Sequence, residues 1–137
     1  MTQGLPDWDS LASDHAAAVE QFASIVRQLP SEAWDRPVSP GKWTPAEITS
    51  HLIESYRILR SELRGGPGMA LRLSAVRRWV FRHTVLPRIL ATGHFPAGAR
   101  APRETRPSEV VSRPVDALDA LSREADAFYR ELTERAG

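Results

Sequence analysis

One stretch of six residues, Trp43–Ile48, marks the beginning of a helix more sharply than any other part of the chain. Thr44 is a preferred N-cap residue, Pro45 suits the first helical position, and Glu47 stands at the spacing of a capping box. The two apolar residues that bound the stretch occupy the positions of a hydrophobic staple. The chain is therefore predicted to form a helix over about residues 45–64, and its fold must be built around that helix.

The remaining periodic segments are also helical in pattern. Residues 10–29, 69–90 and 114–135 carry apolar side chains every three or four positions, and no segment alternates apolar and polar residues as a strand would. The sequence therefore predicts an all-α protein. The stripes expected to be buried are Leu11, His15, Val19, Phe22, Val26 and Leu29 in the first helix, Ile48, Leu52, Ser55, Leu59 and Leu63 in the second, and Leu118, Leu121, Ala125, Phe128 and Leu132 in the last.

Capping and helix-breaking residues delimit these segments. We expect Asp9 or Ser10 to cap the first helix and Pro30 to stop it. The glycines and proline of residues 65–68 end the second helix. Pro87 is expected to kink or shorten the third.

Composition limits the class of protein and the kind of site. The chain has 137 residues, enough for one domain over residues 1–137, and its net charge of +1 gives no bias toward nucleic acid. It has no cysteine, which excludes disulfides and metal–thiolate sites, so a metal must be held by His, Asp or Glu. No signal peptide or long apolar run is present. We expect a soluble cytoplasmic protein that binds neither nucleic acid nor a membrane.

With the second helix placed, residues 41–52 (GKWTPAEITSHL) resemble the Gly-x-Trp-[Ser/Thr]-x-x-Glu-x-x-x-His-Leu motif of the DinB-like superfamily, which includes bacillithiol- and mycothiol-dependent transferases. The order of the remaining segments follows the family over residues 5–135. The resemblance implies an up-and-down four-helix bundle with a long crossover between its second and third helices. Residues 69–91 would lie in the crossover, and the final bundle helix is missing from this chain.

The resemblance also implies a site for a divalent metal such as Zn, Ni or Mn, held by three histidines. His51 stands at the first ligand position. The other two ligands form a His-x-x-x-His pair on the final helix, and no such pair occurs in this sequence. We therefore expect a C-terminally incomplete domain with an incomplete metal site, whose catalytic and cofactor-binding residues cannot be named.

Two functions follow from this interpretation. The first is a relative of the metal-dependent thiol S-transferases, in which the metal would activate a low-molecular-weight thiol as its thiolate. The alternative is a non-catalytic helical module that acts through dimerisation or through binding of a partner protein.

The other candidates for chemistry are His15, His83, His94, Tyr56 and Tyr129. His15 either faces His51 across the bundle or is a hydrogen-bonded histidine at the rim of the core. His83 and His94 belong to the crossover, where surface histidines are common. The two tyrosines act as proton donors only beside a metal or substrate pocket, and otherwise they pack.

Two surfaces remain open to interpretation. Between Leu63 and Arg103 the chain has eight arginines and no acidic residue, so this region either binds an anionic partner or complements the acidic first and last helices. The missing bundle helix would also expose an apolar groove. The crossover helix could fill that groove, two chains could dimerise through it, or the sequence could be a fragment of a longer protein.

Overall fold

A computed structural model describes residues 7–66, 74–94, 100–101, 105–107 and 109–136, and no strand occurs among them. The elements are α1 (Trp8–Gln28), a 3-10 turn η1 (Ser31–Ala33), α2 (Pro45–Leu63), α3 (Ala75–Val80), a π-helical turn η2 (Phe81–Val85), α4 (Leu86–Thr92) and α5 (Pro114–Ala136). The all-α prediction is confirmed. None of these helices combines the length and the apolar character needed to cross a bilayer.

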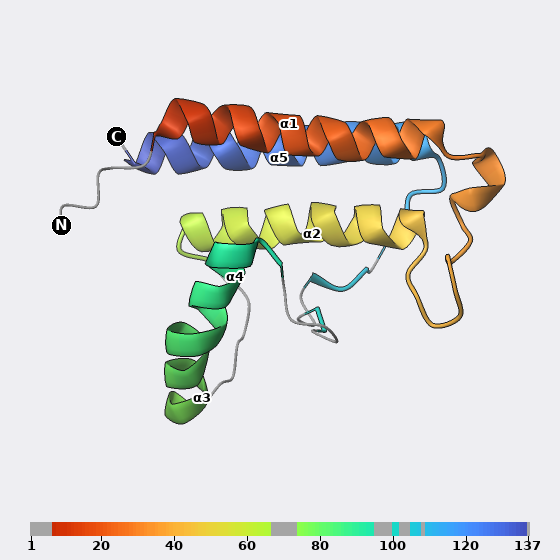
Figure 1. Cartoon of the computed structure of the whole chain (residues 1–137). Coiled ribbons are helices and arrows are strands. Elements are labelled where there is room, and N and C mark those ends of the chain that lie inside the picture. The colour runs from red at the N-terminus through yellow and green to blue at the C-terminus, as the bar shows by residue number, and fades with distance from the viewer. Residues whose placement is uncertain (1–6, 67–73, 95–99, 102–104, 108, 137) are drawn as a thin grey trace.

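The three long helices α1, α2 and α5 form the bundle (Figure 1). α5 packs against both α1 and α2. α1 runs antiparallel to the other two, whereas α2 and α5 run in the same direction. Because α2 and α5 are parallel, the chain must return from the end of α2 to the start of α5. Residues 64–113 make this connection. The expected bundle with a long crossover is confirmed.

The beginning and end of α2 follow the sequence signals. The side chain of Thr44 accepts a hydrogen bond from the Glu47 backbone N–H (3.1 Å), and the Glu47 carboxylate accepts one from the Thr44 backbone N–H (2.9 Å), which completes the capping box. At the other end, Gly65 adopts a positive φ of 76° and the N–H of Gly66 donates to the carbonyl of Ser61. This pattern is a Schellman motif, and it satisfies carbonyls that the helix end leaves free.

α1 begins earlier than the sequence predicted. Its N-cap is Asp7, whose carboxylate accepts a hydrogen bond from the backbone N–H of Ser10 (3.3 Å). The assignment of the cap to Asp9 or Ser10 was therefore wrong, because the amide of Ser10 is the donor that the cap satisfies. On the predicted stripe, Val26 is buried but Leu11 is 45% exposed.

The core lies where α1, α2 and α5 meet the connections between them. Its buried cluster consists of Ala23, Val26, Trp34, Ala46, Ala117 and Leu118. Trp34 is only 2% exposed, and its indole N–H donates to the carbonyl of Val111 (3.2 Å). Its own carbonyl accepts the backbone N–H of Ala46 (3.1 Å). One residue thus ties the start of α2 to the segment before α5.

The buried face of α2 differs from the predicted one. Its buried residues are Ala46, Thr49, Ser50 and Ile53, whereas Ile48, Leu52, Ser55, Leu59 and Leu63 are intermediate or exposed. Two neighbours explain the change: α5 packs against the helix, and the segment before α5 reaches it at Thr105 and Glu109. The hydroxyl of Ser50 donates to the carbonyl of Glu109 (2.7 Å), and that of Thr49 donates to the carbonyl of Pro45 (2.8 Å).

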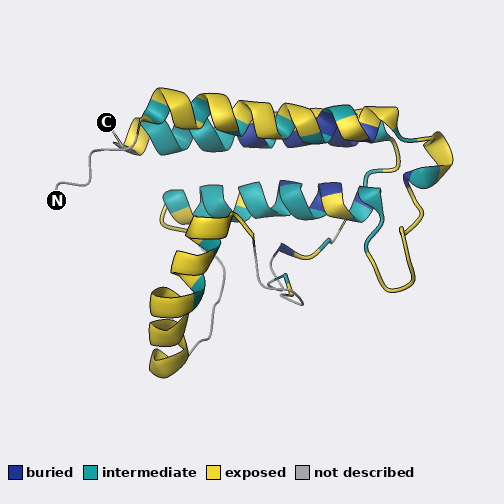
Figure 2. Cartoon of the chain, viewed as in Figure 1, coloured by how far each residue is buried: buried dark blue, intermediate teal, exposed yellow. Residues whose placement is uncertain are grey.

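α3, η2 and α4 form one continuous helical arm that points away from the bundle (Figures 1 and 2). The predicted start at Met69 lies outside the described residues. Pro87 has no backbone N–H. Just before it, the backbone N–H of Leu86 donates to the carbonyl of Phe81, five residues earlier, and this hydrogen bond closes the π turn. The helix continues to Thr92. The arm's elements contact one another far more than they contact the bundle, so the hypothesis that the crossover helix fills a groove is wrong for this segment.

Candidate functional site

His51 lies in the N-terminal half of α2, where the capping box fixes the start of the helix. Its Nδ1 is 2.5 Å from the carbonyl oxygen of Thr105. Since a carbonyl only accepts, Nδ1 carries the proton and Nε2 keeps its lone pair. The indole of Trp43 lies against the imidazole, with ring centroids 5.1 Å apart. His51 is therefore held in one orientation, with one nitrogen able to accept a proton or bind a metal.

A backbone carbonyl on the second ring nitrogen is the arrangement that metal-binding histidines commonly show, because it fixes the tautomer and the ring plane. Within the described ranges, however, no three residues among His, Asp and Glu come close enough to hold an ion. His51 fits one coordination position, and the described residues do not complete the set.

His15 is paired with Tyr56 rather than with His51. Its Nε2 lies 2.8 Å from the Tyr56 hydroxyl, and the two rings meet edge to face at 5.7 Å. The imidazole also stacks on Tyr129, with centroids 5.3 Å apart. Phe128 completes this aromatic cluster between α1, α2 and α5. Burial raises the pKa of the Tyr56 phenol above its ordinary value. The cluster is half-buried and hydrogen-bonded, which agrees with the interpretation of His15 as a rim histidine.

The other candidates lie in separate places. The Tyr129 hydroxyl donates to the carbonyl of Trp8 (2.7 Å) and so joins α5 to the start of α1. His83 lies against Trp79 of the arm, with ring centroids 5.0 Å apart and the ring planes tilted by 47°. His94 is exposed, and its Nδ1 contacts the carbonyl of Thr92 (2.6 Å). None of these residues joins His51 in a cluster within the part of the chain that the structure describes.

A ladder of charges joins α2 to α5 on another face. Arg60 donates to Glu124 (2.6 Å) and to Glu131 (2.9 Å), and Arg64 also pairs with Glu131. Arg57 contacts Glu124 (3.4 Å) and Glu54 of its own helix (2.8 Å). Hydrogen bonds from Arg64 and then Arg60 hold the pKa of the Glu131 carboxyl below its ordinary value. The ladder fixes the register of α2 against α5, a relationship that the sequence did not reveal.

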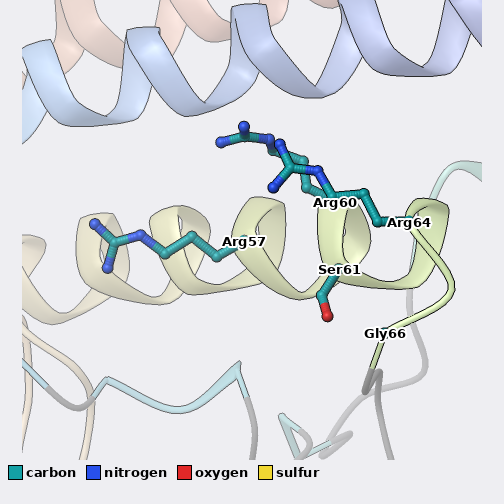
Figure 3. Close-up of a pocket in the computed structure, with 5 residues that line it drawn as sticks. All are labelled: Arg57, Arg60, Ser61, Arg64 and Gly66. Atoms are coloured by element: carbon teal, nitrogen blue, oxygen red, sulfur yellow. The ribbon is translucent and has the colours of Figure 1, made fainter.

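A shallow hollow of about 360 Å³ opens beside this ladder, lined by Arg57, Arg60, Ser61, Arg64 and Gly66 (Figure 3). Figure 3 shows Arg60 and Arg64 directed toward α5, where their carboxylate partners lie. Because the three guanidinium groups are neutralised by Glu54, Glu124 and Glu131, the hollow offers no surplus of positive charge to an anion. A second hollow of about 430 Å³ lies between the end of α1 and the start of α5, and His51 lines neither.

Comparison with known proteins gives one result. The family model described as "Mycothiol maleylpyruvate isomerase N-terminal domain" matches residues 15–136, a range that includes His15, His51, most of α1 and all of α2 and α5. No curated protein and no solved structure matches the chain.

Proposed function

The chain belongs to the family of mycothiol maleylpyruvate isomerase N-terminal domains, within the DinB-like superfamily, and from this membership we propose that it is a metal-dependent domain of the thiol S-transferase type. His51 would supply one ligand to a divalent ion such as Zn, Ni or Mn. The observation that supports this role is the contact of its Nδ1 with the Thr105 carbonyl, which leaves Nε2 free to bind.

A single imidazole holds a divalent ion weakly, because firm sites have three or four converging ligands. In this proposal the remaining positions would be taken by water and by the added thiol, so that uptake of the ion by the chain alone should be weak. A bound ion would lower the pKa of a coordinated thiol, so that the thiolate is populated near neutral pH. The residues of this chain would contribute orientation: the Thr105 carbonyl fixes the imidazole plane, and Trp43 covers one side of the ring.

The absence of cysteine makes the test direct, because a thiolate signal can come only from added thiol. The purified chain would be titrated with Ni²⁺, and mycothiol or bacillithiol would then be added. We expect metal uptake measured by calorimetry, followed by a thiolate-to-nickel charge-transfer band. Both should be lost in His51→Ala and kept in His94→Ala, which removes an exposed imidazole beyond the end of α4.

Two results would contradict the proposal. One is the absence of metal uptake by the folded chain at saturating Zn²⁺, Ni²⁺ and Mn²⁺. The other is equal uptake by the wild type and by His51→Ala. Either result would favour the alternative of a non-catalytic helical module.

A further inference from the structure

We propose that the helical arm of one molecule docks on an exposed face of α1 in a second molecule. In such a pair, each arm contacts the α1 helix of the other copy. The arm is residues 75–92. The face of α1, called here the α1 stripe, consists of Leu11, Asp14, Ala18 and Ile25. This inference goes beyond the proposed function and requires neither a metal nor a thiol.

The arm exposes more large apolar side chains than a solvated helix does. Val76, Trp79 and Leu90 are 71%, 62% and 76% exposed. The other exposed members are Val80, Phe81 and Leu86. Figure 2 shows the arm as almost wholly exposed, in contrast to the half-buried α2. Exposed apolar side chains gathered on one element in this way indicate an interaction site.

The charge of the arm is entirely positive. Its arginines, all exposed, are Arg77, Arg78, Arg82 and Arg88. Residues 74–94 contain no acidic side chain, and the ion pairs of the described chain involve none of these four arginines. Arg78 and Arg82 are four residues apart, as are Trp79 and His83, whose rings are in contact. A surface that covers this arm must therefore combine apolar side chains with negative charge.

The α1 stripe has both properties. Leu11, Ala18 and Ile25 follow one another at intervals of seven residues, which is close to two helical turns, so they lie along one line of α1. All three are exposed, Leu11 by 45% and Ile25 by 55%. Asp14 lies beside this line, is exposed, and has no ion pair among the described residues. The stripe thus complements the arm in both hydrophobicity and charge.

The arm cannot reach the stripe of its own chain in this fold. α1 lies on one side of α2, and the arm leaves from the other side (Figure 1). The stripe of a second copy has no such restriction. If each arm docks on the other copy's stripe, the two contacts are identical and the assembly closes as a two-fold dimer.

An anionic membrane surface would also attract arginines and tryptophan, but the shape of the arm favours a protein partner. A π turn has one residue more than an α turn, so it rotates Leu86 and Leu90 away from the line of Val76 and Trp79. The apolar surface therefore winds around the arm. A planar bilayer would meet only part of it at once, whereas the narrow, straight α1 stripe needs only one part of it to dock.

Charge reversal tests the proposal on exposed residues, where folding is preserved and can be checked by circular dichroism. The wild type should sediment as a dimer. Asp14→Arg in one variant, and Arg78→Glu with Arg82→Glu in another, should each weaken the dimer at least tenfold. An equimolar mixture of the two variants should restore it, because each arm then meets a stripe of opposite charge. Asp126→Arg, an exposed reversal on α5, should have no effect.

Paired cysteines give a second readout, since the natural chain has none. Copies with Ala18→Cys mixed with copies carrying Val76→Cys should form a disulfide-linked heterodimer on mild oxidation. Ala18→Cys mixed with Val38→Cys, at a position that is 90% exposed, should not. A wild type that is monomeric at every concentration, reversals that leave the dimer unchanged, or equal cross-linking of the control pair would each overturn the proposal. A monomer that binds phosphatidylserine vesicles through the arm would also overturn it.

Discussion

The imidazole of His15 and the hydroxyl of Tyr56 share a hydrogen bond of 2.8 Å across 41 residues of sequence, and this bond joins α1 directly to α2. α1 and α2 each pack mainly on α5, so the pair is one of the specific links between the two outer helices of the bundle. Several consequences for stability follow from this and related contacts.

Tyr56→Phe removes the hydroxyl of this bond and keeps the ring. We expect a loss of about 0.5–1.5 kcal/mol in the free energy of unfolding, the usual net value of an intramolecular hydrogen bond. Urea denaturation of Tyr56→Phe, His15→Phe and the double variant measures the coupling directly. A coupling energy of zero would show that the two side chains do not stabilise each other.

The same phenol predicts a dependence on alkaline pH. Burial raises the pKa of Tyr56 above its ordinary value of 10.0. The unfolded chain therefore loses this proton first, and the stabilisation present below that value is lost as pH rises toward the pKa of the folded state. The free energy of unfolding, measured by denaturation at increasing pH, should fall less steeply for Tyr56→Phe than for the wild type. Identical slopes would contradict the burial of the phenol.

The lowered pKa of Glu131 predicts that the free energy of unfolding depends on pH in the acid range. Its pKa is held below the ordinary value of 4.5, mainly by the hydrogen bond from Arg64. The contribution of Glu131 to stability is thus present above that value and lost as pH falls through the pKa of the folded state. Glu131→Gln should flatten the acid limb of the stability curve, and Glu134→Gln, an exposed neighbour, should not. Added salt should reduce the difference.

The capping box predicts the effect of Thr44→Ala. This change leaves the backbone N–H of Glu47 without its side-chain acceptor. We expect a loss of about 1 kcal/mol in chemical denaturation, whereas Thr44→Ser should keep most of the stability. Equal losses in both variants would mean that the methyl group, and not the hydroxyl, is what matters.

Two substitutions of Trp34 distinguish the contribution of its packing from that of its hydrogen bond. Trp34→Ala opens a cavity in the core and should cost about 3–5 kcal/mol, while Trp34→Phe mainly removes the bond to Val111 and should cost less. Limited proteolysis before α5 should accelerate in both variants, because this bond holds the segment in place. Unchanged cleavage in Trp34→Phe would show that packing alone anchors it.

Both ends of α2 could be predicted from the sequence because they depend on neighbouring residues. Thr44 and Glu47 satisfy each other within four positions, and Gly65 adopts the positive φ that ends the helix. The family of the chain was also evident from residues 41–52, which include the start of the same helix.

Contacts between distant segments could not be predicted in this way. Ser50 is buried because its hydroxyl finds the carbonyl of Glu109, and His51 is oriented by the carbonyl of Thr105. Backbone acceptors are present at every residue, so no pattern of side chains reveals which of them will be used. The predicted stripe of α2 was wrong for this reason: periodicity locates an apolar face but does not say which neighbour covers the other faces.

The parallel course of α2 and α5 has a consequence for the order in which the protein is made. The ladder between these helices joins pairs of residues that are separated by 64 to 71 positions in the sequence. The contact of Tyr129 with Trp8 joins residues separated by 121 positions. While the ribosome is still synthesising the crossover, α1 and α2 have no α5 to pack on. We expect the nascent chain to remain without its core until residue 131 has left the exit tunnel.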